Sequence, residues 1–365
     1  MTAVLPRRNR APLSGAFRVA RALVDPAVFD FWSAKVNPLW TWERPMARLK
    51  ARRQASSDAV TLVLQTNRHF AGLRPGQHVN LGVEVEGARL SRSYSPSAVA
   101  GDQIEITVRE VDGGRVSRHL CRDARVGEVF DLGTAFGGMT LPAAVQGAWL
   151  FLAAGSGITP LMAMLRQLDA AGMPVQLDLV YWARTRAELC FADELQALAA
   201  KHACFKLHVA LTREDDGRGT FATRIGETDL AALVAQLDQR QVFACGPHGF
   251  VHSARGLLEG RVQRFDAEAF TPPQALPGEA GTVEVLLSRS GRTLTVPRDR
   301  SLLQALEEQG VRPASGCRMG LCNTCACTRS TGITRDTQTN ARSAEPDATV
   351  RICISAAATD LTLDL

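Results

Sequence analysis

Residues 315–325 read SGCRMGLCNTC, and the cysteines in and after this segment characterise the C-terminal part of the chain. Cys317, Cys322 and Cys325 follow one another with four and then two residues between them, and Cys353 lies further on. Four thiolates with this spacing are the ligand set of a [2Fe–2S] cluster. Glycines inside the segment let the backbone approach a small inorganic core, so that N–H groups point at the sulfurs. The spacing therefore predicts an iron–sulfur cluster.

Two other interpretations of these cysteines are open from the residues alone. The loop can hold a structural zinc ion, but zinc sites usually use two short Cys pairs, and the distant Cys353 fits that pattern poorly. Cys327 can replace Cys325 as a ligand, although alternation along a strand after the loop would make it a small buried side chain instead. Five of the nine cysteines lie between Cys317 and Cys353, which is typical of metal ligation rather than of a disulfide framework.

The length and composition predict a globular protein with more than one domain. A chain of 365 residues exceeds one ordinary hydrophobic core, so two or three domains are expected. No run of eighteen or more uncharged apolar residues occurs, and we expect no membrane span. The basic residues 1–10 are not followed by an apolar segment, so we expect no secretory signal and a cytoplasmic location.

The N-terminal arm, residues 1–43, is basic and aromatic. Residues 1–53 hold eleven Lys and Arg against three acidic residues, a charge of +8 that leaves −3 for the rest of the chain. Three of the five tryptophans, Trp32, Trp40 and Trp42, lie in the arm. The arm can pack along the next domain, extend into solvent, or rest on an acidic partner or an anionic membrane surface. The last interpretation would place the protein at the periphery of the inner membrane.

The hydrophobic pattern changes twice after the arm. Alternation with period two predicts a small antiparallel barrel at 44–145, with strands at 59–65, 77–85, 89–95, 103–110 and 128–132. Buried strands at 148–154, 176–182, 205–211 and 241–245 then alternate with helices at 160–171, 191–200, 230–237 and 249–258. This alternation predicts a doubly wound parallel sheet at 146–265. Residues 266–281, rich in Pro and Gly, are predicted to be a linker, and 282–365 to form a third domain with a helix at 301–309.

Two turns in the predicted parallel sheet have the pattern of a dinucleotide site. Gly155-Ser156-Gly157-Ile158-Thr159-Pro160 follows a buried strand and opens a helix, an arrangement that cradles phosphate. We expect Thr159 to cap this helix and Pro160 to be its first residue. Cys245-Gly246-Pro247 lies at the C-terminal end of a later strand, where open parallel sheets bind ligands. Each turn alone can also be an ordinary strand–helix connection.

Arg184 and Arg186 bear on the choice of nicotinamide coenzyme. They follow the strand that ends at Trp182, and no acidic residue directly after that strand is available to the 2′-hydroxyl of a ribose. Arginine at this place suits a 2′-phosphate. The pattern favours NADPH over NADH, with two solvated loop arginines as the alternative.

Together these motifs resemble known protein families. Residues 282–365 resemble a plant-type ferredoxin domain through the segment SGCRMGLC, and the two glycine turns resemble the nicotinamide domain of the ferredoxin–NADP reductase superfamily. The first resemblance implies four cluster ligands, Cys317, Cys322, Cys325 and Cys353. The second implies that Cys245 lies near the nicotinamide and that Thr159 faces its ring.

Two motifs in the barrel resemble the flavin site of the same superfamily. Arg92-Ser93-Tyr94-Ser95 resembles the R-x-Y-[ST] signature. It implies that Arg92 pairs with flavin phosphate, Tyr94 packs against the isoalloxazine and Ser95 reaches the N5 edge. The turn at 113–117 resembles a second phosphate-binding turn, with backbone N–H groups at Gly114, Val116 and Ser117, although Gly113-Gly114 alone is also compatible with a hairpin. FAD is expected, with FMN as the alternative.

The resemblance covers residues 44–365 and implies a multidomain reductase. Its parts are an antiparallel β-barrel flavin domain, an α/β doubly wound nicotinamide domain and an α+β (β-grasp) ferredoxin domain. Hydride would pass from nicotinamide C4 to flavin N5 at about 3–3.5 Å, and the cluster would deliver single electrons to a protein acceptor. The residues expected at the reacting atoms are Tyr94, Ser95, Thr159 and Cys245.

The acceptor is predicted from weaker resemblances. The segments 31–40, 181–184 and 363–365 look like those of bacterial reductases that serve membrane acyl (stearoyl-CoA) desaturases and related di-iron oxygenases. We therefore expect such a membrane desaturase or a related di-iron oxygenase as the acceptor, and no nucleic acid. The alternative is the reductase component of a soluble ring-hydroxylating dioxygenase or a cytochrome P450, which uses the same modules. A non-enzymatic redox sensor is a third possibility, but a sensor needs no hydride relay.

Overall fold

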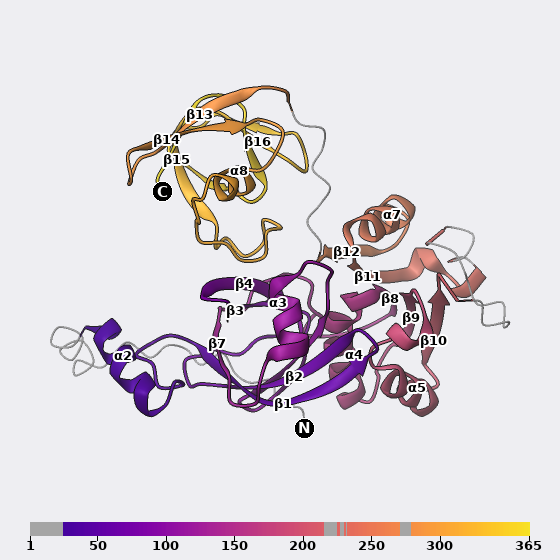
Figure 1. Cartoon of the computed structure of the whole chain (residues 1–365). Coiled ribbons are helices and arrows are strands. Elements are labelled where there is room, and N and C mark those ends of the chain that lie inside the picture. The colour runs from indigo at the N-terminus through magenta and orange to yellow at the C-terminus, as the bar shows by residue number, and fades with distance from the viewer. Residues whose placement is uncertain (1–24, 215–224, 227–229, 231, 271–278) are drawn as a thin grey trace. The chain divides into compact units, whose positions relative to one another are not determined.

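The computed structural model describes residues 25–214, 225–226, 230, 232–270 and 279–365. It divides into two units, Met1–Phe270 and Thr271–Leu365 (Figure 1). None of the helices in the described residues is long and apolar enough to cross a membrane.

The first unit contains a seven-stranded antiparallel sheet of order β4-β3-β7-β1-β2-β6-β5. Its strands are β1 (Met46–Ser56), β2 (Ala59–Thr66), β3 (Val79–Val85), β4 (Ala88–Tyr94), β5 (Pro96–Ala100), β6 (Gln103–Arg109) and β7 (Val129–Leu132). Alternate residues such as Leu62, Leu81 and Ile106 are fully buried in one core, as the period of two requires. Helix α3 (Arg115–Arg118) and the π-helical turn His119–Asp123 pack on this core. The predicted antiparallel flavin-domain fold is confirmed.

Two strands of this sheet were not predicted, because their sequences lack a clear alternation. β1 is polar and basic over most of its length and buries mainly its first residues, Met46, Ala47 and Leu49. Its position is set by long pairing with β2 and short pairing with β7. β5 begins with Pro96, which is tolerated because β5 is an edge strand.

A five-stranded parallel sheet of order β10-β9-β8-β11-β12 follows in the same unit. The elements are β8 (Ala148–Ala154), α4 (Ile158–Ala170), β9 (Gln176–Ala183), α5 (Ala192–Lys201), β10 (Phe205–Leu211), β11 (Arg240–Gly246), α7 (His248–Leu258) and β12 (Arg264–Ala269). Trp149 and Phe151 of β8 pack with α4 and α5, whereas Leu150 and Leu152 pack with α7. Helices therefore cover both faces, and the doubly wound sheet is confirmed.

The central strand β8 pairs with β9 on one side and with β11 on the other. The order of strand addition reverses at this point, and ligands of such sheets bind beyond the carboxyl ends of these strands. The turn Gly155–Gly157 leaves β8 there, and Gly246 ends β11. Both predicted nicotinamide motifs thus lie at the switch point of the sheet.

The predicted linker at 266–281 and the predicted helix at 230–237 are only partly covered by the described residues, and the linker begins differently from the expectation. β12 continues to Ala269 and pairs with β11, so the segment predicted to be a linker from residue 266 begins with a strand. Its low apolar content made it resemble a loop. Residues 271–278 of that segment, and residue 231 of the helix predicted at 230–237, lie outside the described residues.

The second unit consists of a five-stranded sheet of order β14-β13-β20-β15-β18 and a three-stranded sheet of order β17-β16-β19. The strands are β13 (Thr282–Leu287), β14 (Arg292–Pro297), β15 (Ala326–Thr331), β16 (Thr334–Asp336), β17 (Arg342–Ser343), β18 (Ala348–Arg351), β19 (Ser355–Ala357) and β20 (Leu361–Leu363). Helix α8 (Leu302–Glu308) is capped by Ser301, whose hydroxyl accepts a hydrogen bond from the Gln304 N–H. Its buried leucines pack on the larger sheet, which confirms the predicted α+β fold.

A fully buried arginine connects the two sheets of this unit. Arg329 on β15 donates hydrogen bonds to the Thr334 hydroxyl at 2.9 Å and to the backbone carbonyls of Ser343 and Glu345. A buried cation is costly unless its N–H groups find acceptors. Here the guanidinium holds β16 and the end of β17 against β15.

Replacing Arg329 by Met should destabilise the second unit. The Arg329→Met side chain keeps its length but leaves the buried carbonyls without donors. We expect the free energy of unfolding to fall by about 2–5 kcal/mol in guanidinium titrations followed by circular dichroism. Arg292→Met, at an exposed position of β14, is the control and should change it by less than about 0.5 kcal/mol. Equal stability of the two variants would contradict a structural role for Arg329.

Candidate functional site

The cysteine loop surrounds its first sulfur with backbone N–H groups. Cys317 Sγ accepts hydrogen bonds from the N–H groups of Met319, Leu321 and Cys322 at 3.3–3.4 Å. Cys322 Sγ in turn accepts from the Cys317 N–H at 3.2 Å. Gly320 has a φ of +76°, and a Cβ there would lie 2.5 Å from a neighbouring isoleucine side chain. This donor-rich loop suits a sulfur cluster that becomes more negative on reduction.

The four predicted cluster ligands form two thiol pairs. The hydrogen bond between Cys317 and Cys322 lowers the pKa of Cys322 and raises that of Cys317. A hydrogen bond between the free thiols of Cys325 and Cys353 likewise lowers the pKa of Cys325 and raises that of Cys353. Within the described ranges, no group of three or more His, Cys, Asp or Glu side chains is arranged to hold a single metal ion. Two pairs of sulfurs fit a cluster of two irons.

Cys327 lies beyond this loop, on β15. It pairs with Val350 of β18 and packs against the apolar core of the unit. Burial raises the pKa of its thiol to about 11. Its position on β15, beyond the loop and against this core, agrees with a packing role for Cys327.

The two predicted nicotinamide turns touch each other. A Cβ on Gly157 would lie 2.1 Å from the carbonyl oxygen of Cys245, and a Cβ on Gly246 would lie 2.9 Å from the Cβ of Ala154. Only glycine at both positions lets the ends of β8 and β11 approach this closely. Gly155 opens the first turn with a φ of +56°, and Pro247 precedes α7. The structure thus brings both predicted motifs to one place.

Thr159 and Pro160 lie inside α4, so the expectation that they form its start is wrong. The helix begins at Ile158, because the turn Gly155–Gly157 continues into it without a break. The buried Thr159 hydroxyl donates to the Ser156 carbonyl at 3.1 Å. Pro160 is tolerated because an N–H in the first turn has no acceptor within the helix.

The predicted flavin residues lie on β4, at Ser95 directly after it, and at the start of α3, and β4 and α3 are packed together. On β4, the Ser93 hydroxyl donates to the Asn80 side chain, and Arg92 donates to the Ser91 carbonyl at 2.7 Å. Burial raises the pKa of Tyr94, so its phenol stays neutral. A neutral aromatic ring beside a guanidinium suits a flavin with its phosphate.

The turn before α3 can accept a phosphate only because it contains glycine. A Cβ on Gly114 would lie 2.4 Å from Ser117 Oγ and 2.9 Å from the Val111 carbonyl oxygen. The N–H groups of Val116 and Ser117 belong to the first turn of α3 and have no acceptor within the helix. Such donors in a glycine turn fit an anionic group, so these residues are compatible with the flavin phosphate.

Two residues that the sequence analysis missed connect the flavin and nicotinamide motifs. His78 Nδ1 lies 2.6 Å from Ser95 Oγ, and His78 Nε2 contacts a carboxylate oxygen of Glu268. Glu268 lies on β12 directly opposite Cys245 of β11. The His78 and Glu268 side chains are only 8% and 12% exposed. Direct contacts therefore connect Ser95, the residue predicted to reach flavin N5, through His78 to Glu268, which pairs with Cys245 on the neighbouring strand.

This line of contacts can move a proton. The imidazole can take a proton from the Ser95 hydroxyl side and release one to Glu268, and little water competes at so buried a pair. Burial raises the pKa of Cys245 well above its usual value, and the nearby Glu268 carboxylate adds to the effect. Cys245 is therefore a neutral thiol, suited to contact with a ring rather than to nucleophilic attack.

The two predicted coenzyme arginines lie beyond β9 and near carboxylates. Arg184 Nε lies 2.8 Å from Glu188 Oε2, and its Nη2 lies 3.4 Å from Asp58 Oδ2. The Arg186 N–H donates to the Glu214 carboxylate at 2.7 Å. Asp58 and Glu214 are distant from the arginines in sequence, and Glu188 follows them after a turn. The residues directly after β9 therefore did not indicate these carboxylates. Glu188 and Asp58 compete with a phosphate for the Arg184 guanidinium, whereas Glu214 contacts the backbone of Arg186.

The fold and these motifs define a pyridine nucleotide-dependent flavin reductase with a ferredoxin-type domain. Three family models match the chain in this order: the oxidoreductase FAD-binding domain at 46–140, the oxidoreductase NAD-binding domain at 151–256 and the 2Fe-2S iron-sulfur cluster binding domain at 285–358. The predicted cofactor classes are thereby confirmed.

Whole-chain comparisons agree with the order of these domains. An NADPH oxidoreductase of Mycobacterium tuberculosis is 34% identical over 95% of this chain and 91% of its own. The glycine betaine monooxygenase reductase subunit of Pseudomonas aeruginosa is 26% identical over 83% and 90%, respectively. The structure of phthalate dioxygenase reductase superimposes with a TM-score of 0.58 at 24% identity, over 88% of this chain and 97% of that chain. The chain belongs to the ferredoxin–NADP reductase superfamily of oxidoreductases, which disfavours the non-enzymatic sensor.

Serine substitutions should separate the cluster ligands from the packing cysteine. Cys325→Ser removes a thiolate from one pair, and we expect the purified protein to lose most of its cluster absorbance and about half or more of its iron. Cys327→Ser is the matched control, two residues away, and should keep a full complement of iron and labile sulfide. Loss of the cluster in Cys327→Ser with its retention in Cys325→Ser would reverse the ligand assignment.

Gly157→Ala should impair the nicotinamide site without unfolding the sheet. The added methyl group would meet the Cys245 carbonyl and push the ends of β8 and β11 apart. We expect the rate of flavin reduction by NADPH in stopped-flow measurements to fall by about tenfold to a hundredfold. Gly256→Ala in α7, where a Cβ meets nothing within 4 Å, is the control and should reduce normally. An unchanged rate in Gly157→Ala would show that the two turns need not touch.

Proposed function

We propose that this protein takes hydride from NADPH and delivers single electrons through FAD and a [2Fe–2S] cluster to an iron-containing oxygenase. The observation that carries the proposal is the contact of His78 with both Ser95 and Glu268. Through His78, Ser95 of the predicted flavin motif is connected to Glu268, which pairs with Cys245 on the neighbouring strand. The two pairs of cysteines in the same chain supply a one-electron exit.

The chain's own residues would bind and orient the cofactors. Arg92 and the first-turn N–H groups of α3 would hold the flavin phosphates, and Tyr94 would pack against the ring. Ser95 would lie at N5, with His78 and Glu268 exchanging the proton there. When bound, the flavin supplies the conversion of a two-electron donor into single electrons.

A soluble oxygenase is the acceptor that the relatives favour. Two of them are named as the reductase subunit of glycine betaine monooxygenase and the ferredoxin reductase component of 3-ketosteroid-9-alpha-monooxygenase. These names support the oxygenase alternative better than the expected desaturase. A membrane desaturase is the second candidate, because α2 (Pro26–Val36) carries exposed aromatic side chains that a soluble partner does not require.

NADPH is the proposed donor. Arg184 and Arg186 follow β9 at the place where a 2′-phosphate would be recognised. The relative that spans 95% of this chain is named an NADPH oxidoreductase. Glu188 and Glu214 argue in the other direction, since a carboxylate at this edge can accept a hydrogen bond from the ribose 2′-hydroxyl of NADH.

An anaerobic visible spectrum with each coenzyme in turn tests the relay. We expect flavin and iron–sulfur bands that NADPH bleaches at least about tenfold faster than NADH, because the arginines stabilise the additional phosphate. Arg184→Gln should reduce this preference and leave the limiting rate with NADH unchanged. A flavin that neither nucleotide reduces would contradict the proposal, and faster bleaching by NADH would reverse the donor.

A second assay separates the two acceptors. The reduced protein is mixed with a purified ring-hydroxylating oxygenase component or with membranes that contain an acyl desaturase. Rapid oxidation by the soluble component alone supports the first candidate. Oxidation by the membranes alone supports the second.

A further inference from the structure

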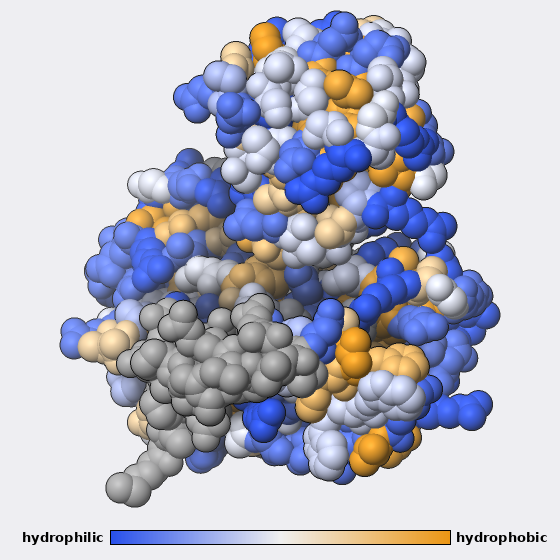
Figure 2. Space-filling model, turned by 90° about the vertical axis from the view of Figure 1, so that its left-hand side faces the viewer, coloured by the Kyte–Doolittle hydropathy of each residue, from blue (hydrophilic) through white to orange (hydrophobic). Residues whose placement is uncertain are grey.

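Helix α2 turns an apolar face to solvent. Val28, Phe31, Trp32 and Val36 follow one another at helical spacing and are 52%, 58%, 66% and 74% exposed. Trp40, just after the helix, is 57% exposed. Residues at i, i+3, i+4 and i+8 lie on one side of a helix, so the four form a single stripe. Figure 2 shows apolar side chains at the surface among hydrophilic ones on the side that carries α2.

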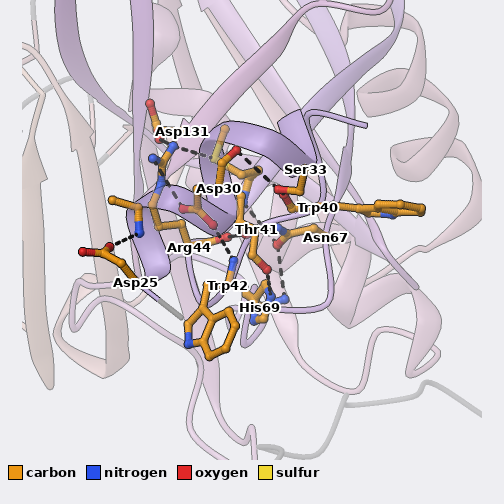
Figure 3. Close-up of polar contacts among 12 residues, drawn as sticks. Asp25, Asp30, Ser33, Trp40, Thr41, Trp42, Arg44, Asn67, His69 and Asp131 are labelled. Atoms are coloured by element: carbon orange, nitrogen blue, oxygen red, sulfur yellow. Dashed lines mark hydrogen bonds and ion pairs between the residues drawn. The ribbon is translucent and has the colours of Figure 1, made fainter. Parts of the chain in front are cut away.

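The opposite side of α2 is fixed to the barrel by polar contacts (Figure 3). Asp30 accepts a hydrogen bond from the Trp42 N–H at 2.6 Å and pairs with Arg44, which also reaches Asp131 of β7 at 2.9 Å. The Ser33 hydroxyl donates to the Trp40 carbonyl at 2.7 Å. These contacts orient the helix so that the apolar stripe points away from the barrel.

Contacts around residues 39–44 extend this anchor. The Asn67 amide donates to the carbonyls of Leu39 and Arg44 at 3.1 and 3.0 Å, and His69 Nε2 lies 2.8 Å from the Thr41 carbonyl oxygen. The helix itself is capped by Asp25, whose carboxylate accepts from the Ala27 N–H. The stripe therefore belongs to a folded and oriented helix.

This orientation is unusual for an amphipathic helix. None of the residues of α2 is fully buried. The helix is held by its N-cap, by polar contacts and by the edge-on packing of Phe29 against Trp42, whose ring centres are 5.3 Å apart. Large apolar side chains gathered on an exposed face mark a surface that binds another protein, a membrane or a ligand.

The charge around the stripe identifies the occupant. Lys35 lies within the stripe, with its ammonium 5.4 Å from the centre of the Phe31 ring. Asp30 faces the barrel and its side chain is only 14% exposed. In the sequence, five arginines and no acidic residue precede Asp25, the N-cap of the helix. Trp and Phe flanked by Lys and Arg are the composition of a helix that lies in the interface of an anionic bilayer.

We propose that α2 docks this reductase on the surface of an anionic lipid bilayer, with Phe31, Trp32 and Val36 inserted between headgroups. The stripe runs from Val28 to Val36 and is about 12 Å long. That is short for a stable protein–protein interface, which buries about 800 Å² per partner, but sufficient for an interfacial helix. Docking needs neither cofactor chemistry nor the acceptor, so it holds whichever oxygenase or desaturase receives the electrons.

Vesicle sedimentation of the full-length holoprotein tests the proposal. Vesicles of phosphatidylcholine mixed with phosphatidylglycerol are compared with vesicles of phosphatidylcholine alone, at low and at high salt. We expect binding to the anionic vesicles that weakens at high salt, because exposed charges are then screened. Trp32→Ser should lower the partition coefficient by about tenfold, and Phe31→Ser/Trp32→Ser by more.

The control removes apolar surface elsewhere. Val126 and Leu286 are 67% and 38% exposed and lie on other elements, so Val126→Ser/Leu286→Ser should bind vesicles like the original protein. All variants should reduce a soluble acceptor such as cytochrome c with NADPH at the original rate, which shows that they are folded and loaded. This readout also separates failure of docking from failure of the proposed function.

A second measurement places the tryptophan. The emission of Trp32, obtained as the difference between the original protein and Trp32→Phe, should shift to shorter wavelength when anionic vesicles are added. Absence of vesicle binding, or binding that the Phe31 and Trp32 substitutions leave unchanged, would overturn the proposal. Loss of self-association or of acceptor binding in these variants, without any vesicle binding, would assign the stripe to a protein partner instead.

Discussion

The contact between His78 and Glu268 is the interaction on which the cofactor geometry depends. Hydride transfer requires the two reacting atoms to approach within about 3–3.5 Å, so the barrel and the parallel sheet have to be held in register. His78 belongs to the barrel and Glu268 to the last strand of the parallel sheet. Arg166 of α4 adds to this connection by donating to the Ser97 carbonyl at 3.0 Å and pairing with Glu105 of β6. These contacts of His78 and Arg166 are polar and directional, so they fix the barrel relative to the parallel sheet more precisely than an apolar contact would.

The second unit meets a different constraint, the stabilisation of charge on sulfur. Backbone N–H groups gather at Cys317 because the loop turns sharply, and Gly320 is what permits this turn. Buried Arg329 holds the two sheets of the unit together. Arg329 lies on β15, which begins directly after Cys325, so the strand that Arg329 anchors also carries the end of the cysteine loop.

The arm shows that two interpretations of one segment need not exclude each other. Its polar residue Asp30 pairs with Arg44, which also pairs with Asp131 of the barrel, as the packing interpretation requires. Its aromatic residues Phe31 and Trp32 face solvent, as the proposed lipid contact requires. A helix can satisfy both because its two faces are set by different residues.

The sequence by itself determined the three domain types, because each depends on local patterns: alternation in the barrel, buried strands in the parallel sheet and cysteine spacing in the loop. It also pointed to Gly157 and Cys245, although it could not show that their backbones touch. β1 was missed because pairing with β2, rather than its own polar pattern, makes it a strand. His78 and Glu268 were missed because they are 190 residues apart and neither lies in a recognisable motif. Only the tertiary structure could decide such contacts, since a hydrogen bond between distant segments leaves no periodic signal in either of them.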